Sequence, residues 1–199
     1  MRKLVILTFL SLDGVMQAPG GKGEDPSGGF DLEGWSIPLF DEVVGEEMTK
    51  QMEPPFDLLL GKKTYDIFAA HWPNQPDEEA GWINKATKYV VSSDEVNTEW
   101  DKTVQVSNDV VSEIKKLKDT EGPDLQVHGS SNLIQTLLKN DLADELWLKI
   151  FPVTLGKGKR LFGSGTIPAN YKLINSKVSP SGVIIASYKR DGEVKLGTV

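Results

Sequence analysis

Two stretches of the sequence combine an apolar run, a glycine and polar side chains in an order that suits phosphate binding. In the first, residues 58–65, three leucines lead into Gly61, Lys62, Lys63 and Thr64. The pattern predicts a buried strand that runs directly into a helix, whose first backbone amides are free to bind an anion. Glycine lets a ligand approach the backbone, and lysines add positive charge. A plain strand-to-helix turn with solvated lysines is the alternative interpretation.

The second stretch, residues 125–133, repeats this order. An apolar strand ends at His128 and is followed by Gly129, Ser130 and Ser131, and an amphipathic helix comes next. A simple capped helix start is again the alternative. Because ligands of open α/β sheets bind at the carboxyl ends of the strands, the two junctions together predict a dinucleotide whose pyrophosphate lies between two helix starts.

Other chemistries lack their sequence motifs. No G-x-G-x-x-G follows the first predicted strand, no Walker A motif can be read at residues 155–159, and no G-x-S-x-G occurs. The chain has no cysteine, and its two histidines, His71 and His128, are far apart. We therefore expect no metal site, no thiol nucleophile and no disulfide framework.

Charge and hydropathy limit the partners. The 199 residues carry 22 basic and 29 acidic side chains, a net charge of -7, which disfavours a general nucleic-acid surface. No apolar run reaches 18 residues, so no membrane span is expected. The basic and then apolar N-terminus is interpreted as a first buried strand rather than a signal peptide. The expectation is one cytoplasmic domain, residues 1–199, that acts on a small molecule.

Hydrophobic periodicity predicts an α/β fold with a mixed, mainly parallel sheet and antiparallel C-terminal strands. The predicted strands are 3–10, 57–60, 88–92, 103–106, 125–128, 145–151, 171–177 and 183–190. The predicted helices are 36–52, 62–70, one capped by Ser107 or Asn108, and one capped by Ser130 or Ser131. In strand 145–151, alternation places Glu145, Trp147 and Lys149 on one face, which we expect to be the wetter face of an edge region. The glycine-rich segment 19–30 is predicted to be a mobile loop that closes over a substrate; an inconsequential surface loop is the alternative.

Five segments, in order along nearly the whole chain, resemble the dihydrofolate-reductase-like family. The likeness is greatest to the single-domain proteins similar to the reductase domain of bifunctional riboflavin-biosynthesis deaminase-reductases. The segments are SLDG at 11–14, LGKKTY at 60–65, YVVSS at 89–93, VHGSSNL at 127–133 and DELWLKIFPVTLGKGKRLF at 144–162. The resemblance implies a three-layer dihydrofolate-reductase-like fold, an NADPH cofactor and a homodimer.

The resemblance also implies roles for individual residues. Phosphates of NADPH would contact Gly61, Lys62, Lys63 and Thr64, and the pyrophosphate would lie on Gly129, Ser130 and Ser131. Ser92 and Ser93 would lie near the adenosine ribose, and Gly14 and Val15 on the nicotinamide side.

The chain departs from the family pattern at several positions. It has Gly129-Ser130 where the wider family has Gly-Gly, and His128 where the riboflavin enzymes usually carry Glu. Asp94 follows Ser93 where an Arg is often found, and no deaminase domain is present. The cofactor class therefore transfers better than the substrate or the choice between NADP and NAD.

Reduction of a C=N or C=O bond consumes a proton, for which the sequence offers two candidate donors. His128 follows a strand and has an ordinary pKa near working pH, and Asp13 follows the first strand. The alternatives are a histidine bonded to the backbone, a turn-forming aspartate, and a proton from water. The sequence predicts an NADPH-dependent oxidoreductase of a small pyrimidine- or pterin-like compound. A non-catalytic nucleotide-binding protein and an NAD-preferring reductase are the alternatives.

Overall fold

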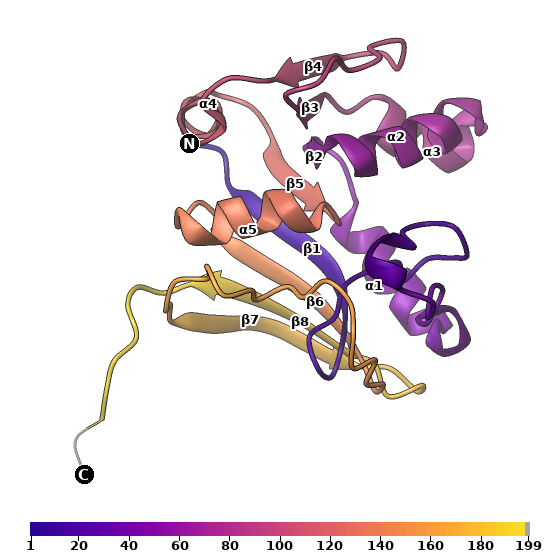
Figure 1. The fold of residues 1–199 in the computed structure, drawn as a ribbon, viewed down its shortest axis with the longest axis vertical. Coiled ribbons are helices and arrows are strands. Elements are labelled where there is room, and N and C mark those ends of the chain that lie inside the picture. Colours follow the sequence, from indigo (N-terminus) through magenta and orange to yellow (C-terminus); the bar gives the residue numbers. More distant parts are fainter. Residues whose placement is uncertain (198–199) are drawn as a thin grey trace.

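An eight-stranded mixed sheet organises the chain in a computed structural model, which describes residues 1–197 (Figure 1). The strand order is β4-β3-β2-β5-β1-β6-β8-β7, so β1 lies near the middle. The strands are β1 Leu4–Ser11, β2 Phe56–Gly61, β3 Lys88–Val91, β4 Thr103–Val106, β5 Asp124–His128, β6 Glu145–Phe151, β7 Tyr171–Val178 and β8 Ile184–Arg190.

The first six strands pair in parallel, and β8 then pairs antiparallel with both β6 and β7. Strands β1 and β2 are apolar on both faces because helices cover them on both sides. This arrangement confirms the predicted fold class, with its mixed sheet and antiparallel C-terminal strands.

Five α-helices cover the sheet: α1 Glu42–Gln51, α2 Lys62–His71, α3 Asp77–Asn84, α4 Val110–Asp119 and α5 Ser131–Lys139. Apolar residues of α4 and α5 pack on one face against β1, β5 and β6, and α5 crosses that face in Figure 1. On the opposite face, α2 and α3 pack on β2 and β3, and α1 packs near β6 and β8. Within residues 1–197, no helix is long and apolar enough to span a bilayer.

The sheet opens between β1 and β5. These strands pair only from Leu4 to Leu7, where Leu7 lies opposite His128. On its other side, β1 pairs with β6 as far as Ser11. The edge of β1 beyond Leu7 that faces β5 therefore has no strand partner. The connection after β1 leads toward β2 on one side of this gap, and the connection after β5 leads to β6 on the other side. Ligands of open α/β sheets bind at such a point, where the connections diverge.

The structure differs from the predicted elements in three respects. The first helix begins at Glu42, because Asp41 caps it by accepting a hydrogen bond from Val44 N (3.0 Å), and a short 3-10 turn precedes it. Helix α4 is capped by Asp109 rather than by Ser107 or Asn108. Helix α3 was not predicted.

The expectation of a wetter face on β6 was also wrong. Strand β6 lies between β1 and β8, and its Glu145 and Lys149 are only 5% and 3% exposed. The face that carries Lys149 packs toward α1. Lys149 is therefore an interior side chain.

Candidate functional site

A cavity of about 770 Å³ opens at the carboxyl ends of β1, β2 and β5. Its volume lies within the range of small-molecule sites. Both glycine junctions line it, with Gly61, Lys62, Lys63 and Thr64 on one side and Gly129, Ser130 and Ser131 on the other. The sequence therefore predicted correctly that the two junctions share one site.

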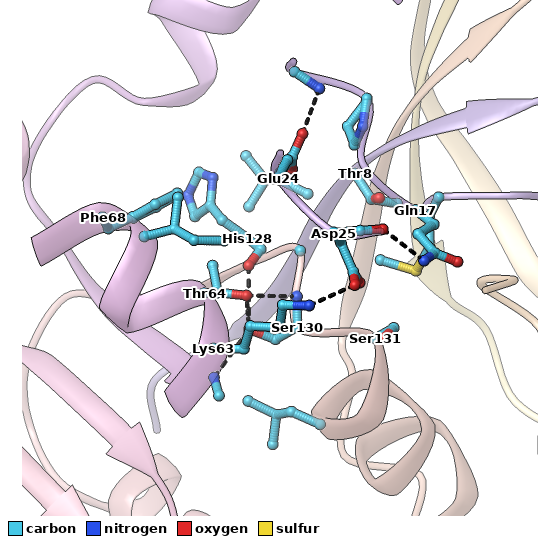
Figure 2. Close-up of a pocket in the computed structure, with 18 of the residues that line it drawn as sticks. Thr8, Gln17, Glu24, Asp25, Lys63, Thr64, Phe68, His128, Ser130 and Ser131 are labelled. Carbon is cyan, nitrogen blue, oxygen red and sulfur yellow. Dashed lines mark hydrogen bonds and ion pairs between the residues drawn. The ribbon is translucent and has the colours of Figure 1, made fainter. Parts of the chain in front are cut away.

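Hydrogen bonds join the two junctions directly (Figure 2). The amide of Gly61 donates to Ser130 Oγ (2.9 Å), and the amide of Ser130 donates to Thr64 Oγ1 (3.1 Å). The hydroxyls of Ser130 and Thr64 are also bonded (2.8 Å). Gly129 and Ser130 take left-handed backbone angles, φ +61° and +56°, which turn the chain tightly into α5. The starts of α2 and α5 are thus held side by side.

Neither of these helix starts has a side-chain cap. Helices α1 and α4 are capped by Asp41 and Asp109, whereas the side chain of Ser130 at the start of α5 is used to bind α2. Free amides at two adjacent helix N-termini attract an anion, because the helix dipoles add to the hydrogen bonds.

The charges that line the cavity are mainly positive, although the chain as a whole is acidic. The lysines are Lys62, Lys63, Lys149 and Lys159, against the carboxylates of Glu24 and Asp25. Lys62 pairs with Asp66 (2.8 Å), and both Lys63 and Lys159 pair with Asp25. These pairs offset the cost of lysines at a helix N-terminus, and a phosphate would compete with the carboxylates for them.

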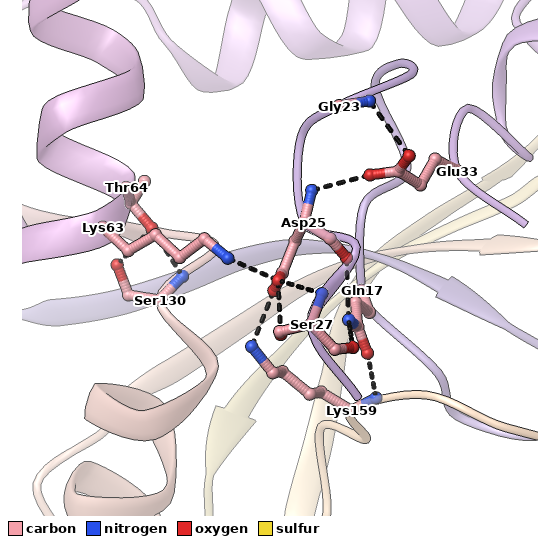
Figure 3. A network of polar contacts seen from close by, with 9 residues as sticks. All are labelled: Gln17, Gly23, Asp25, Ser27, Glu33, Lys63, Thr64, Ser130 and Lys159. Atoms are coloured by element: carbon pink, nitrogen blue, oxygen red, sulfur yellow. Dashed lines mark hydrogen bonds and ion pairs between the residues drawn. The ribbon is translucent and has the colours of Figure 1, made fainter. Parts of the chain in front are cut away.

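Asp25 fastens the glycine-rich loop over the cavity (Figure 3). Its carboxylate accepts from Lys63 and from Lys159 (2.6 Å), and its backbone amide donates to Glu33 Oε1 (2.9 Å). Burial opposes ionisation of Asp25, but hydrogen bonds from Lys159, Lys63 and Ser27 hold its pKa well below the ordinary value. The loop lines the cavity through Pro19, Gly20, Glu24 and Asp25, a position that suits a lid.

Replacement of Asp25 by Asn is expected to release this loop, because the amide cannot pair with two ammonium groups. Limited proteolysis of the free protein should then cleave within residues 19–30 several times faster than in the wild type. Asp31→Asn is the matched control, since Asp31 is exposed and, among the residues that the structure describes, forms its ion pair with Lys157 (2.8 Å). Equal cleavage of Asp25→Asn and the wild type would show that the pairs do not hold the loop.

The other end of the cavity is largely apolar. Leu7 and Phe9 of β1 line it, together with Met48 of α1 and with Ile67 and Phe68 of α2. Met52 and Trp72, which directly follow α1 and α2, complete this wall. His128 and Lys149 are the titratable groups from the sheet in this wall. Such a surface suits the flat face of an aromatic ring rather than a phosphate.

His128 lies in the cavity as a neutral side chain. Its Nε2 is 3.0 Å from Gln126 Oε1, and its ring lies 6.4 Å from that of Phe68. The ring is partly exposed to the cavity, but burial by the walls, together with the charge of Lys149, lowers its pKa to about 3. At neutral pH the imidazole of His128 is therefore neutral, and its role as a proton donor stays a prediction.

Asp13 lies outside the cavity and serves the backbone. Its carboxylate accepts from the amides of Leu155 (3.0 Å) and Gly156 (2.8 Å) and from Ser11 Oγ (2.6 Å). These hydrogen bonds, that of Ser11 first, hold the pKa of Asp13 far below its ordinary value. Asp13 thus orders the turn after β1 and is not among the residues that line the cavity, and its role as a proton donor stays a prediction.

Four predicted cofactor residues also do not line the cavity. Val15 is buried, and Gly14 forms the turn before it, while the lining begins two residues later with Met16 and Gln17. Ser92 and Ser93 follow β3, where the lining residue is Val91 instead. Val91 of the YVVSS segment therefore lines the cavity, as does Met16, which follows the SLDG segment by two residues, whereas the four predicted residues do not.

Several cavity residues had no predicted role, Glu24 and Lys149 among them. Glu24 accepts from the amide of Gly20 (2.6 Å), and burial raises its pKa. Lys149 is almost wholly buried and faces the cavity. Lys149 lies within the segment 144–162 that resembles the family, but that resemblance gave it no role; the signal for it was a lysine within a hydrophobic strand. Among residues 1–197, no three His, Asp or Glu side chains are grouped to hold a metal ion.

Known structures share this fold. A putative riboflavin biosynthesis protein from Shewanella sp. PV-4 superposes with a TM-score of 0.64 at 23% identity, covering 95% of this chain and 99% of that one. Dihydrofolate reductase from Enterococcus faecalis, in a complex with NADP(H) and RAB-propyl, gives 0.57 at 14% identity, covering 95% and 96%. The three-layer dihydrofolate-reductase-like fold is thereby confirmed.

Sequence relatives extend over the same length. The uncharacterised protein YyaP of Bacillus subtilis (strain 168) is 27% identical over 196 residues, which cover 96% of each chain. The model of the RibD C-terminal domain family matches residues 2–185. This match takes in β1 to β7 and ends at the start of β8, and the protein belongs to the RibD C-terminal domain family.

Proposed function

We propose that the protein is an NADPH-dependent reductase of a small pyrimidine- or pterin-like heterocycle. The observation that carries the proposal is the pair of uncapped helix starts, bonded to each other and lined with lysines, at one end of a cavity whose other end is apolar. Family membership and the dihydrofolate-reductase-like fold support a reductase-type activity.

The residues present fit a dinucleotide cofactor. A Cβ on Gly61 would lie 3.5 Å from Ser130, and one on Gly129 would lie 3.5 Å from Thr64, so a side chain at either position would fill space beside the helix starts. At Gly129 a side chain would also be strained, because φ is +61°. In this proposal Gly129, Ser130 and Ser131 hold the pyrophosphate, and Thr64 orients Ser130. Lys62 and Lys63 bind a further phosphate, which favours NADPH over NADH.

The middle of the cavity suits the nicotinamide ring. Thr8 and Phe9 line it on the part of β1 that has no β5 partner. Backbone groups of such a free edge can bond a carboxamide as they would bond a strand. When bound, NADPH supplies the hydride, and the chain binds, orients and excludes water.

The apolar end suits the substrate. Phe68 and the methionines of α1 offer flat contact to a ring, and the loop at residues 19–30 closes the other side. Enclosure by such walls keeps water from the reacting carbon. His128 and Lys149 are the polar groups of the sheet that can fix the orientation of the ring there.

Fluorescence titration with NADPH and NADH tests the cofactor, and a panel of compounds tests turnover. The panel is dihydrofolate, 7,8-dihydropterin and an aminopyrimidinedione with a ribosylamino side chain, followed by the loss of NADPH absorbance. We expect tighter binding of NADPH than of NADH and reduction of at least one compound.

Other outcomes identify the alternatives. No binding of either cofactor at millimolar concentration would refute the reductase, and binding without turnover would indicate a nucleotide-binding protein. Tighter binding of NADH would indicate an NAD-preferring reductase. The homodimer remains a prediction, which sedimentation velocity tests.

A further inference from the structure

Lys149 differs from the other buried lysines in having no hydrogen-bond acceptor. Lys88 Nζ donates to the carbonyls of Asn84 (2.8 Å) and Asp101 (3.0 Å), and Lys118 Nζ donates to Leu142 O (2.8 Å) and pairs with Asp144 (2.6 Å). Within residues 1–197, Lys149 Nζ makes no hydrogen bond or ion pair with the protein, although the residue is only 3% exposed, and Lys149 lines the cavity. A buried ammonium without an acceptor is costly, which points to a ligand as its partner.

The surroundings of Lys149 direct its ammonium toward the cavity. Lys149 lies opposite Phe9 on β1 and opposite Ile185 on β8, and Nζ is 5.9 Å from the centre of the Phe9 ring. The titratable groups that face it are Glu47 from α1 and His128 from β5. Glu47 forms ion pairs with Lys50 (2.9 Å) and Lys177 (3.1 Å). Because Glu47 is paired with these two lysines, the ammonium of Lys149 remains available to a ligand in the cavity.

We propose that Lys149 is the catalytic acid, which gives its Nζ proton to the ring nitrogen or carbonyl oxygen of the substrate at the apolar end of the cavity. This proposal rests on the proposed reductase function and deepens it. It assigns the proton to a residue of β6 instead of His128, Asp13 or bulk water.

Reduction of a C=N or C=O bond of the heterocycle consumes one hydride and one proton. The reduced nicotinamide cofactor supplies the hydride, whose electron pair makes the new C–H bond. The π bond opens toward the heteroatom, which takes a proton from Lys149 Nζ. Lys149 is left as a neutral amine and regains a proton from water when the product leaves.

The protonation chemistry of the cavity agrees with this role. Burial lowers the pKa of Lys149 to about 7, partly opposed by Glu47, so the ammonium releases its proton easily near neutral pH. An ordinary lysine would hold it too tightly. His128 is already neutral and Asp13 is outside the cavity. Glu24 belongs to the loop, where its carboxylate accepts from Gly20.

The test compares Lys149→Met, Lys149→Arg and Lys149→Ala with Lys189→Met, an exposed strand lysine on β8. The substrate is the panel compound that the wild type reduces fastest. We expect Lys149→Met to lower kcat by about 100-fold or more. The Kd of NADPH, measured by fluorescence, should stay within about twofold, since Lys149 lies away from the helix starts.

Two readouts separate proton donation from a structural role. The wild-type kcat/KM should fall tenfold per pH unit above about pH 7, and the Lys149→Met profile should lack this fall. Lys149→Arg should not recover activity, because a guanidinium keeps its proton. Added ethylammonium should restore part of the rate to Lys149→Ala and should leave the rate of the control Lys189→Met unchanged. In ¹³C-lysine NMR spectra, the resonance that is missing from Lys149→Met should titrate near pH 7.

Two results would contradict the proposal, and they distinguish failure of the acid from failure of the reductase. Wild-type kcat in Lys149→Met, or a Lys149 resonance that titrates at an ordinary lysine pH, would refute the acid while leaving the reductase intact. A wild-type protein that binds NADPH but reduces no panel compound would refute the reductase, and the acid with it.

Discussion

Replacement of both Lys62 and Lys63 by Ala is expected to weaken NADPH binding by about 100-fold. A charge-assisted hydrogen bond contributes roughly 1.5–3 kcal/mol, and we take the lower end because these side chains are 35% and 55% exposed and therefore screened. NADH, which lacks the 2′-phosphate, should lose less. Fluorescence titrations of both cofactors measure the two losses.

Lys115 and Lys116 provide the matched control for this pair. They are consecutive and exposed on α4, and their replacement by Ala changes the net charge equally without touching the cavity. We expect the control to leave both affinities within about twofold. Equal losses for NADPH and NADH in the cavity variant would place these lysines on the pyrophosphate instead of the 2′-phosphate. No loss for either cofactor would mean that Lys62 and Lys63 only pair with Asp66 and Asp25.

The sequence was sufficient to predict the strands and the meeting of the two junctions. Apolar runs of β-branched and leucine residues identify buried strands, and glycine followed by polar residues identifies where helices begin. Parallel strands end at one edge, so the two junctions were expected to meet at the same edge of the sheet. The hydrogen bond between them confirms this adjacency.

The sequence did not predict which face of β6 would be covered. Alternation shows that Glu145 and Lys149 share a face, but it does not show that α1, about a hundred residues earlier, packs toward it. Burial of Lys149 therefore depends on tertiary packing. The same limit applies to Asp13, whose carboxylate is taken by the amides of a loop at 155–156 that is distant in sequence. Local sequence patterns indicated the strands on which Asp13 and Lys149 lie or end, but the burial of Lys149 and the hydrogen bonds of Asp13 depend on segments that are distant in the sequence.

The environment of Lys149 also predicts a large effect on stability. Lys149→Met should raise the free energy of unfolding at pH 7 by about 2–4 kcal/mol, because methionine fills a similar volume and removes an unpaired buried charge. Methionine packs readily beside Phe9 and Met48 in this wall. A lysine that costs this much is retained where activity requires it, so the same substitution should increase stability and abolish turnover.

The pH dependence of the stability difference between Lys149→Met and the wild type tests whether the charge of Lys149 causes it. The pKa of Lys149 is about 7 in the folded protein and 10.5 in the unfolded chain, so between these values the unfolded chain binds more protons. As the pH rises through this window, the free energy of unfolding of the wild type therefore increases by up to about 1.4 kcal/mol per pH unit because of Lys149. Below pH 7 Lys149 is charged in both states, and its full destabilising effect is present. The advantage of Lys149→Met should be largest at pH 7 and below and should shrink toward pH 10.

Urea unfolding at pH 6 to 10 measures the difference in stability between the two proteins. Lys88, whose pKa is about 8, titrates in both of them, so its contribution cancels. Lys189→Met should show no such trend, whereas a Lys149→Met variant that is less stable at pH 7, or whose advantage does not change with pH, would mean that Lys149 is not an unpaired buried cation.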